Sequence, residues 1–219
     1  MPGALVQLTR KILALALMSI AAAANGATEH DWELQDEDDT LQVFTREVDA
    51  SPFLEVMARV QINAPVSRVT KFLGDGNGCA EWRARCRSSQ VLEEVSDEQR
   101  YVYLVLDMPW PLTDRDMVIH SQTKLAPDSS SAIVNLRTDS SRHPPGDFVR
   151  AESVGQFILR VLPDQQVEFT YIMHTDLGGD LPPGSVNARL AESTMDDLRR
   201  LKALAEGLPP ALSGASGRP

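Results

Sequence analysis

Alternation of apolar and polar residues dominates the first part of the chain. Residues 41–48 (LQVFTREV) and 53–62 (FLEVMARVQI) both show the period of two that is typical of a strand with one buried face. The turn-forming connection Ala50-Ser51-Pro52 between them predicts an antiparallel hairpin. The buried face of the second strand is predicted to carry Leu54, Val56, Ala58, Val60 and Ile62.

The same pattern continues beyond residue 88 in segments that short polar turns separate. Short connections between consecutive strands are typical of an antiparallel meander, so we expect one sheet of about seven or eight strands. These further strands are predicted at 89–95, 100–108, 117–125, 131–138, 154–162 and 166–176.

Helical spacing of apolar residues occurs in two segments. A short helix is predicted at 65–75, where Pro65 suits the first turn and glycines follow. A longer one is predicted at 186–207, about six turns that end at Gly207 and Pro209-Pro210. The long helix has a broad apolar stripe, which must lie against the sheet, so the fold class is α+β. The stripe comprises Val186, Leu190, Met195, Leu198, Leu201 and Leu204.

The N-terminus has the pattern of a secretory signal peptide. Arg10-Lys11 precede the uncharged run 12–24, and small residues follow through Ala27. The sequence therefore predicts a signal peptide at 1–27, one domain at 28–207 and a flexible tail at 208–219. A periplasmic or secreted protein is expected, without a lipid anchor because no cysteine follows the apolar run.

Charge narrows the set of partners. The chain has a net charge of −10, and removal of Arg10 and Lys11 with the leader changes this to −12. Nucleic acid is excluded as a partner because phosphate binding needs a basic surface. An anionic membrane would repel the protein on average, which favours transient membrane contact. We expect a monomer.

Two cysteines, Cys79 and Cys86, remain in the mature chain, and an exported protein favours a disulfide between them over two free thiols. Seven residues of continuous helix would separate their Cα atoms by about 10 Å, beyond the ~7 Å reach of a disulfide. The bond therefore requires a break in CAEWRARC. No metal site is expected, because two cysteines without a nearby histidine pair do not bind zinc.

The segment MPWPLTDRDMV (108–118) carries a family resemblance. A proline-aromatic-proline turn followed by Arg115-Asp116 and an apolar strand resembles the signature of START domains, the steroidogenic acute regulatory protein-related lipid-transfer family, and most closely its phosphatidylcholine-transfer branch. WELQDEDDTLQVFTREV, EWRARCRSSQVLEEV and GGDLPPGSVN resemble three further segments of that family in the same order. The resemblance extends from about residue 31 to residue 206.

This resemblance implies a helix-grip fold, in which a curved antiparallel sheet wraps around the C-terminal helix and encloses a hydrophobic tunnel for one lipid. The implied function is binding and intermembrane transfer of that lipid, with loops and the helix as a gate, without catalysis or a cofactor. In the motif, Pro109 and Pro111 are expected to hold a rigid turn with Trp110 packed beneath it. Arg115 and Asp116 are expected to have a structural role.

Strand parity predicts which side chains line the tunnel. The inward set on 117–125 is Met117, Ile119, Ser121 and Thr123, so His120 faces the other way. Members that bind sterols or phosphatidylcholine commonly have an arginine at the position of Ser121, so a phosphate-binding cation is absent there. The other predicted lining residues are Tyr101, Tyr103 and Val105 on the neighbouring strand and Val186, Leu190 and Leu198 on the helix.

Two alternatives remain at this stage. Helix-grip folds also include cyclases and hydrolases, and His174 and Asp176 share a strand face, so a helix-grip enzyme acting on a hydrophobic small molecule is one. No nucleophile or metalloprotease motif accompanies this pair. The other is an envelope docking or sensor module that would use the apolar stripe of the last helix to bind a protein.

Overall fold

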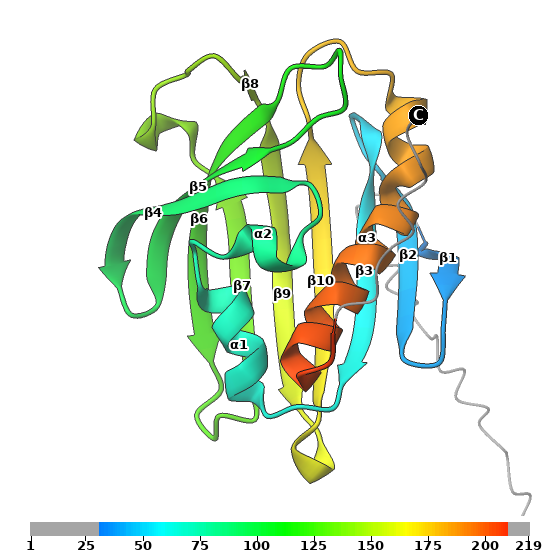
Figure 1. The fold of residues 1–219 in the computed structure, drawn as a ribbon, viewed down its shortest axis with the longest axis vertical. Coiled ribbons are helices and arrows are strands. Elements are labelled where there is room, and N and C mark those ends of the chain that lie inside the picture. Colours follow the sequence, from blue (N-terminus) through cyan, green and yellow to red (C-terminus); the bar gives the residue numbers. More distant parts are fainter. Residues whose placement is uncertain (1–30, 210–219) are drawn as a thin grey trace, which may run out of the picture.

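The computed structural model describes residues 31–209, so the predicted signal peptide and most of the predicted tail lie outside the described residues. Ten strands form one sheet, and three α-helices lie over its concave side (Figure 1). The α+β helix-grip prediction is confirmed. The strands are β1 (Glu33–Glu37), β2 (Leu41–Val48), β3 (Ser51–Ile62), β4 (Cys86–Ser96), β5 (Gln99–Leu106), β6 (Arg115–Leu125), β7 (Ser131–Thr138), β8 (Val149–Arg150), β9 (Glu152–Val161) and β10 (Val167–Asp176).

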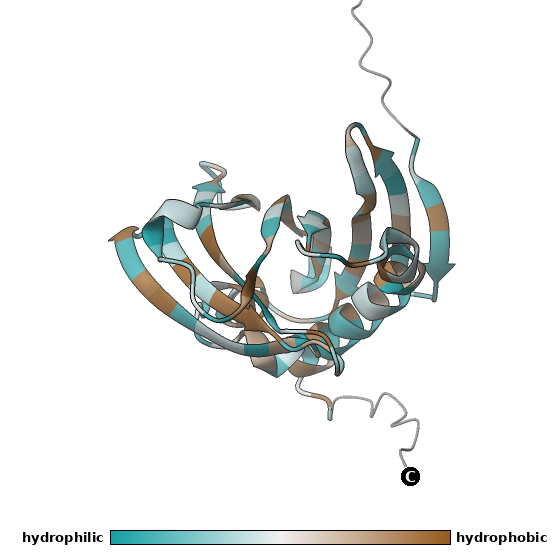
Figure 2. Ribbon diagram, turned by 90° about the horizontal axis from the view of Figure 1, so that it is seen from above, coloured by the Kyte–Doolittle hydropathy of each residue, from teal (hydrophilic) through white to brown (hydrophobic). Residues whose placement is uncertain are grey.

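The order of strands across the sheet is β1-β2-β3-β10-β9-β7-β6-β5-β4, and β8 pairs with β6. All neighbours in the main path are antiparallel, and only the short β8 is parallel to its partner. Seen from above, the sheet bends into an arc around the interior (Figure 2). Twist accumulates over so many strands, and the bend leaves a concave face for the helices to cover.

The helices are α1 (Val66–Gly74), α2 (Cys79–Trp82) and α3 (Pro183–Glu206), with single turns of 3-10 helix at Ser140–Arg142 and Pro163–Gln165. Helix α3 begins at Pro183 and is capped by Gly207, whose φ of 74° is the left-handed conformation that favours glycine. The N–H of Leu208 then donates to the carbonyl of Ala203, as in a Schellman motif. Within residues 31–209, none of the helices is long and apolar enough to cross a membrane.

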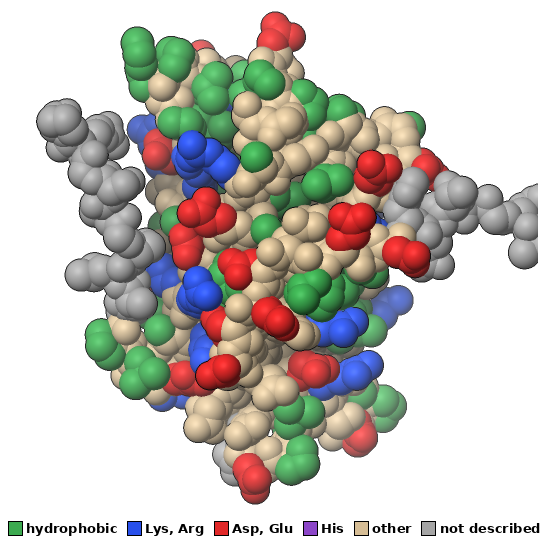
Figure 3. Space-filling model, turned by 90° about the vertical axis from the view of Figure 1, so that its right-hand side faces the viewer, with side chains coloured by type: hydrophobic (Ala, Val, Ile, Leu, Met, Phe, Trp, Pro, Cys, Tyr) green, Lys and Arg blue, Asp and Glu red, His purple; other side chains and the backbone are tan. Residues whose placement is uncertain are grey.

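The core lies between the second half of α3 and the strands β2, β3 and β10. The predicted inward face of β3 is confirmed for Val56, Ala58, Val60 and Ile62, which are at most 1% exposed. Each fully buried aliphatic side chain of this size stabilises the fold by about 1.5–3 kcal/mol before entropy is counted. Their partners on α3 are Met195, Leu198, Leu201 and Ala205. Figure 3 shows acidic and basic side chains interspersed over the outer face on this side.

Two strands were not predicted. Residues 33–37 pair with β2 as the exposed edge strand β1. The two-residue strand β8 is too short to carry any periodicity, and it forms because Val149 and Ala151 donate backbone hydrogen bonds to Asp114 and Asp116.

Candidate functional site

A cavity of about 1120 Å³ lies between the concave face of the sheet and the helices. Its walls come from β3, β5, β6, β7, β9 and β10, and it is covered by α1, α2, α3 and the loops at 107–112 and 177–182. Side chains from segments far apart in the sequence meet around it, most of them aliphatic or aromatic. A concave space with mostly apolar walls and a few polar groups is the usual form of a small-molecule site.

Strand β6 presents to the cavity the side chains that strand parity predicted. Met117, Ile119, Ser121 and Thr123 all line it. His120 lies on the opposite face of the sheet, where its ring stacks on Tyr101 with 4.6 Å between the ring centroids. The inner surface of β6 is therefore apolar at Met117 and Ile119 and hydroxyl-bearing at Ser121 and Thr123, and it carries no cation.

The prediction for β5 is wrong by one residue. Tyr101, Tyr103 and Val105 lie on the outer face, and the cavity is lined by Val102, Leu104 and Leu106 instead. The cause is the register, since β5 pairs Leu104 with Met117 and Val102 with Ile119. Directly opposed residues in an antiparallel pair share a face. The outward Tyr103 donates a hydrogen bond of 3.1 Å to Asp116.

Helix α3 has two parts with different surroundings. Val186 and Leu190, in its first half, line the cavity as predicted. Leu198 does not line it, and is 1% exposed within the core. Leu198 belongs to the core cluster with Met195 and Leu201, whereas its neighbours Asp196 and Asp197 line the cavity.

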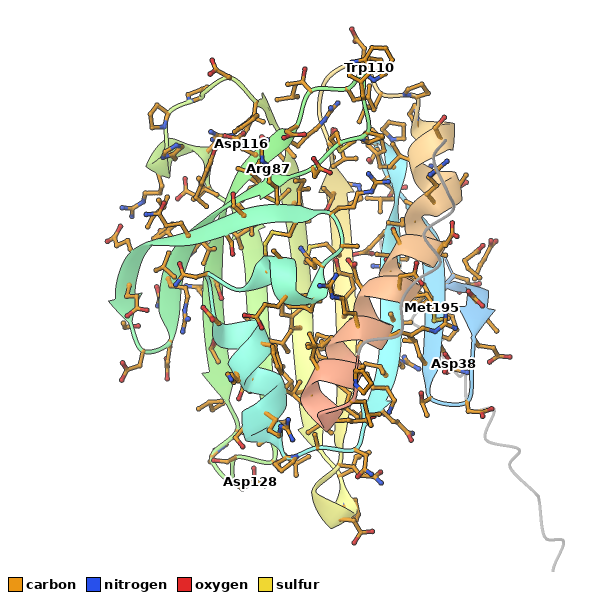
Figure 4. All side chains as sticks on the ribbon, in the orientation of Figure 1. Asp38, Arg87, Trp110, Asp116, Asp128 and Met195 are labelled. Carbon is orange, nitrogen blue, oxygen red and sulfur yellow. A yellow bond between two sulfur atoms is a disulfide. The ribbon has the colours of Figure 1, made fainter. Side chains whose placement is uncertain are left out.

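The loop between β5 and β6 forms one end of the cavity. Pro109 and Leu112 line it, and the Leu112 N–H donates to the Pro109 carbonyl across a tight turn at 3.0 Å. Trp110 was expected to pack beneath this turn, but its side chain is 93% exposed and projects from the end of the molecule (Figure 4). Trp110 and Pro111 are the two central residues of the turn, and such residues lie at its tip.

Arg115 and Asp116 form a buried polar network behind this loop. Arg115 is 3% exposed, and it donates to the carbonyls of Leu177 at 3.2 Å and Gly178 at 3.3 Å. Asp116 is 1% exposed and pairs with Arg150 at 2.8 Å. These bonds hold the start of β6 against the loop that leads into α3. The geometry agrees with a structural role for this part of the motif.

The segment between α2 and β4 carries a disulfide. Cys79 and Cys86 are bonded, with their Cα atoms 5.9 Å apart. Helix α2 ends at Trp82, so residues 83–85 supply the break in the helix that such a bond requires. This short closed loop presents Arg83 to the cavity.

Arg83, Tyr171 and Asp197 form a polar cluster in the otherwise apolar cavity lining. The guanidinium of Arg83 donates to the Tyr171 hydroxyl at 2.7 Å, and its Cζ lies 4.8 Å from the ring centroid of Trp82. Asp197, on α3, accepts a hydrogen bond of 2.8 Å from the backbone N–H of Ala84. Burial raises the pKa of Asp197 and of Tyr171, although the charge of Arg83 acts in the opposite direction on both.

Arg83 was not singled out from the sequence. The three members of the cluster are separated by 88 and 26 residues along the chain, so no local pattern links them. The available signal was the position of Arg83 between a buried tryptophan and the second cysteine of a short disulfide loop. Its proximity to Tyr171 could be seen only in three dimensions.

His174 and Asp176, the pair considered for catalysis, lie at the end of β10 and hydrogen-bond to different segments. His174 contacts the Ser51 hydroxyl at 2.9 Å and Asp176 accepts from the N–H of Gly178, so these two residues have separate partners. Among residues 31–209, no group of three His, Cys, Asp or Glu side chains could hold a metal ion. A second cleft, of about 510 Å³, lies on the outer face of the sheet and is lined by polar side chains such as the ion-paired Arg46 and Glu55.

Comparison with known proteins gives concordant results. The model of the START domain matches residues 12–208. An uncharacterized protein of Pseudomonas aeruginosa is 27% identical over 201 residues, which cover 90% of this chain and 98% of that protein. A solved fragment of a STAR-related lipid transfer protein from Xanthomonas axonopodis is 29% identical, covers 78% of this chain and 97% of its own, and superposes with a TM-score of 0.72.

Human StAR-related lipid transfer protein 5 shares the fold at 18% identity, with a TM-score of 0.73 over 80% of this chain and 86% of the human one. At that identity the likeness concerns the fold alone. The match to the family model extends over far more than half of the sequence, and the sheet, the covering helix and the enclosed cavity agree with it. The chain therefore belongs to the START domain family.

Proposed function

We propose that this protein binds a single lipid, a phospholipid, in the cavity and transfers it between membranes without chemical change. The observation that carries this proposal is the apolar cavity of about 1120 Å³ under α3. Each methylene removed from water contributes about 0.8 kcal/mol, so an acyl chain can leave a bilayer at low cost only for an enclosure of this kind. The name of the similar Xanthomonas protein, a lipid transfer protein, supports the proposal.

The exposed tip of the β5–β6 loop supports transient membrane contact at this end of the cavity. Trp110 is 93% exposed and Leu112 is 38% exposed, beside the cavity-lining Pro109. Tryptophan favours the boundary between lipid and water, where its ring and its N–H both find suitable surroundings. The net charge of −10 opposes lasting adhesion to anionic lipid, which suits a carrier that must leave the membrane again.

Motion of this loop and of the first half of α3 would open the cavity, and it would limit the transfer rate. We place the monomeric protein outside the cytoplasm on the basis of the leader-like residues 1–27, and in the phosphatidylcholine-transfer branch on the basis of its motifs. Fractionation of cells that express the full chain tests the first assignment, since recovery from the cytoplasm would contradict it.

The direct test is native mass spectrometry of protein purified without detergent, followed by extraction of the bound molecule and a vesicle transfer assay. We expect one lipid per chain, recovered unaltered after transfer. Ser121→Trp, which projects a bulky indole into the cavity, should block uptake. Gln122→Trp places the same side chain on the outer face and should leave uptake unchanged. A wild-type protein that takes up no lipid from vesicles, or returns an altered one, would contradict the proposal.

The membrane contact has its own test. Trp110→Ala should slow transfer to zwitterionic vesicles while changing the free energy of unfolding by less than about 0.5 kcal/mol, because the side chain buries little surface in the protein. Val95→Ala is a matched control, since it removes an apolar side chain that is 50% exposed elsewhere. Equal transfer rates for the two variants would show that the tip has no part in membrane contact.

A further inference from the structure

We propose that Arg83 and Tyr171 bind an anionic oxygen of the ligand's headgroup inside the cavity. This inference rests on the proposed lipid-binding function, and it names the ligand class as an amphiphile with a phosphate or carboxylate group. The two side chains come from the α2–β4 connection and from β10, and both line the cavity. The cation is thus placed within the lining rather than at its rim.

Arg83 has unused donors held in a fixed position. A guanidinium carries five N–H groups. Within residues 31–209, the side chain of Arg83 makes one hydrogen bond, to the Tyr171 hydroxyl. Its Cζ also lies 4.8 Å from the ring centroid of Trp82 and 5.5 Å from that of Tyr171. Contact with the two rings orients the guanidinium plane, so little freedom is lost when a ligand binds.

Tyr171 provides a second donor directed at the same region. Its oxygen accepts from Arg83, so its own hydroxyl hydrogen is free to donate, and within the described part of the chain no acceptor lies within reach of it. Burial raises the pKa of this hydroxyl, which keeps it protonated. The ring is held by stacking on Phe157, with 5.5 Å between the ring centroids. Two oriented donors therefore converge in low-dielectric surroundings, where bonds to an anion are strong.

Asp197 is the nearby group that opposes an anion. One of its oxygens accepts from the Ala84 N–H, and its carboxyl acts on Arg83 and Tyr171 through space. Burial is the largest influence on its pKa and raises it, which favours the neutral form. A buried cation needs a nearby anion, and a ligand phosphate or carboxylate can supply it in place of Asp197.

The other cavity-lining arginines are less suited to this task. Arg85 and Arg189 are exposed to solvent, where an ion pair contributes little. Arg100 donates to the carbonyl of Gly74. The inward residues of β6 are uncharged. Arg83 is thus the partly buried cavity-lining arginine in the described chain whose guanidinium also lies against two aromatic rings and donates to a buried tyrosine hydroxyl.

The test measures uptake from phosphatidylcholine vesicles that carry tracer amounts of three lipids with the same labelled acyl chain: phosphatidylcholine, diacylglycerol and free fatty acid. Arg83→Gln should weaken uptake of the phosphate-bearing tracer by about 10-fold or more, the usual effect of losing one charge-assisted hydrogen bond, and leave uptake of diacylglycerol unchanged. Arg160→Gln removes the same charge from the outer face of β9, away from the cavity lining, and should change the uptake of neither tracer.

The fatty acid tracer distinguishes the two sources of the anionic oxygen. Loss of fatty acid uptake alone would assign the site to a carboxylate, and loss of phosphatidylcholine uptake would assign it to a phosphate; either supports the proposal. Tyr171→Phe keeps the ring packing, and it should weaken by several-fold the uptake of the tracer that Arg83→Gln affects. Asp197→Asn should strengthen its uptake, and these two variants test the site even if Arg83→Gln does not fold.

Two outcomes would overturn the inference, and they can be told apart. Wild-type protein that takes up lipid, with the same selectivity as Arg83→Gln and Tyr171→Phe, would refute the headgroup site and leave the proposed function intact. Wild-type protein that takes up none of the three tracers would refute the proposed function, and the headgroup site with it.

Discussion

Arg115 and Arg83 both lie within this fold, but their surroundings differ. Arg115 is almost fully buried, and its guanidinium donates to the carbonyls of Leu177, Gly178 and Thr113. Arg83 is only partly buried and donates to the Tyr171 hydroxyl. An arginine whose three nitrogens all donate to backbone carbonyls is part of the framework, whereas one that donates through a single nitrogen has donors available to a ligand. Four measurements test this distinction.

The largest effect is expected in the network that contains Arg115. Asp116→Ala leaves the guanidinium of Arg150 without its buried partner, and loss of one member of such a pair costs about 3–5 kcal/mol of unfolding free energy. Denaturant unfolding measures this loss. Arg87→Ala breaks the exposed pair with Asp114 and should cost less than about 1 kcal/mol. Similar losses for the two variants would show that the network is not a framework element.

The next largest effect is expected from the disulfide whose closed loop contains Arg83. Replacing Cys79 and Cys86 together by serine should lower the free energy of unfolding by about 2 kcal/mol, the entropic contribution expected for so short a closed loop. Hydrogen exchange should increase at residues 79–86 and remain unchanged at the start of β6. An equal increase in hydrogen exchange in both regions would contradict the distinction between the surroundings of Arg83 and those of Arg115.

A smaller loss of stability is expected at Arg83 itself. Arg83→Gln removes one hydrogen bond from a partly exposed side chain, so the free energy of unfolding should fall by about 1 kcal/mol or less. Denaturant unfolding of Arg83→Gln and of Asp116→Ala under the same conditions compares the two losses of free energy. A loss as large as that of Asp116→Ala would make Arg83 a second framework residue, and the changes in lipid selectivity would then need another explanation.

The smallest effect is a dependence of stability on pH. Burial raises the pKa of Asp197 above its ordinary 3.8, so the folded protein holds this proton more tightly than the unfolded chain does. The resulting stabilisation is complete below that ordinary value and is lost as pH rises through the raised pKa. As pH rises from below 3.8, wild type should therefore lose stability relative to Asp197→Asn, as measured by denaturation at each pH.

Asp114, next to Arg115, should give a dependence of stability on pH that has the opposite sign. Its pKa is lowered, chiefly by the hydrogen bond from the Met108 N–H and then by Arg87. The contribution of Asp114 to the free energy of unfolding is therefore present above its ordinary pKa of 3.8, and it is lost as pH falls through the lowered pKa. A difference of the same sign for Asp114→Asn and Asp197→Asn would contradict the assigned surroundings of these two carboxyls.

Periodicity was sufficient for elements in which burial repeats along the chain. The inward faces of β3 and β6 and all but the first turn of α3 follow from it, because one face of each meets the interior. Periodicity did not show which face of β5 points inward. That depends on how the loop 107–114 sets the register of β5 against β6, and a shift of one residue exchanges the two faces. Trp110 was misplaced because its apolar character was taken to imply burial.

The polar groups of the candidate site were harder to predict than its apolar walls. Ser121 was identified through a family motif, and its strand parity was enough to place it in the lining. Arg83, Tyr171 and Asp197 come together only because α2, β10 and α3 surround the same space. No property of any one of these segments carries that information.

The volume of the cavity has a thermodynamic consequence. At ~24 cal/mol for each Å³ of unfilled core, a dry space of 1120 Å³ would cost about 27 kcal/mol, more than the ~5–15 kcal/mol by which a typical domain is stable. The interior must therefore contain water or a guest, or contract. If the protein has the proposed function, the bound lipid is part of the hydrophobic core. Delivery of that lipid then replaces it in the cavity by water or by another lipid, and does not leave the cavity empty.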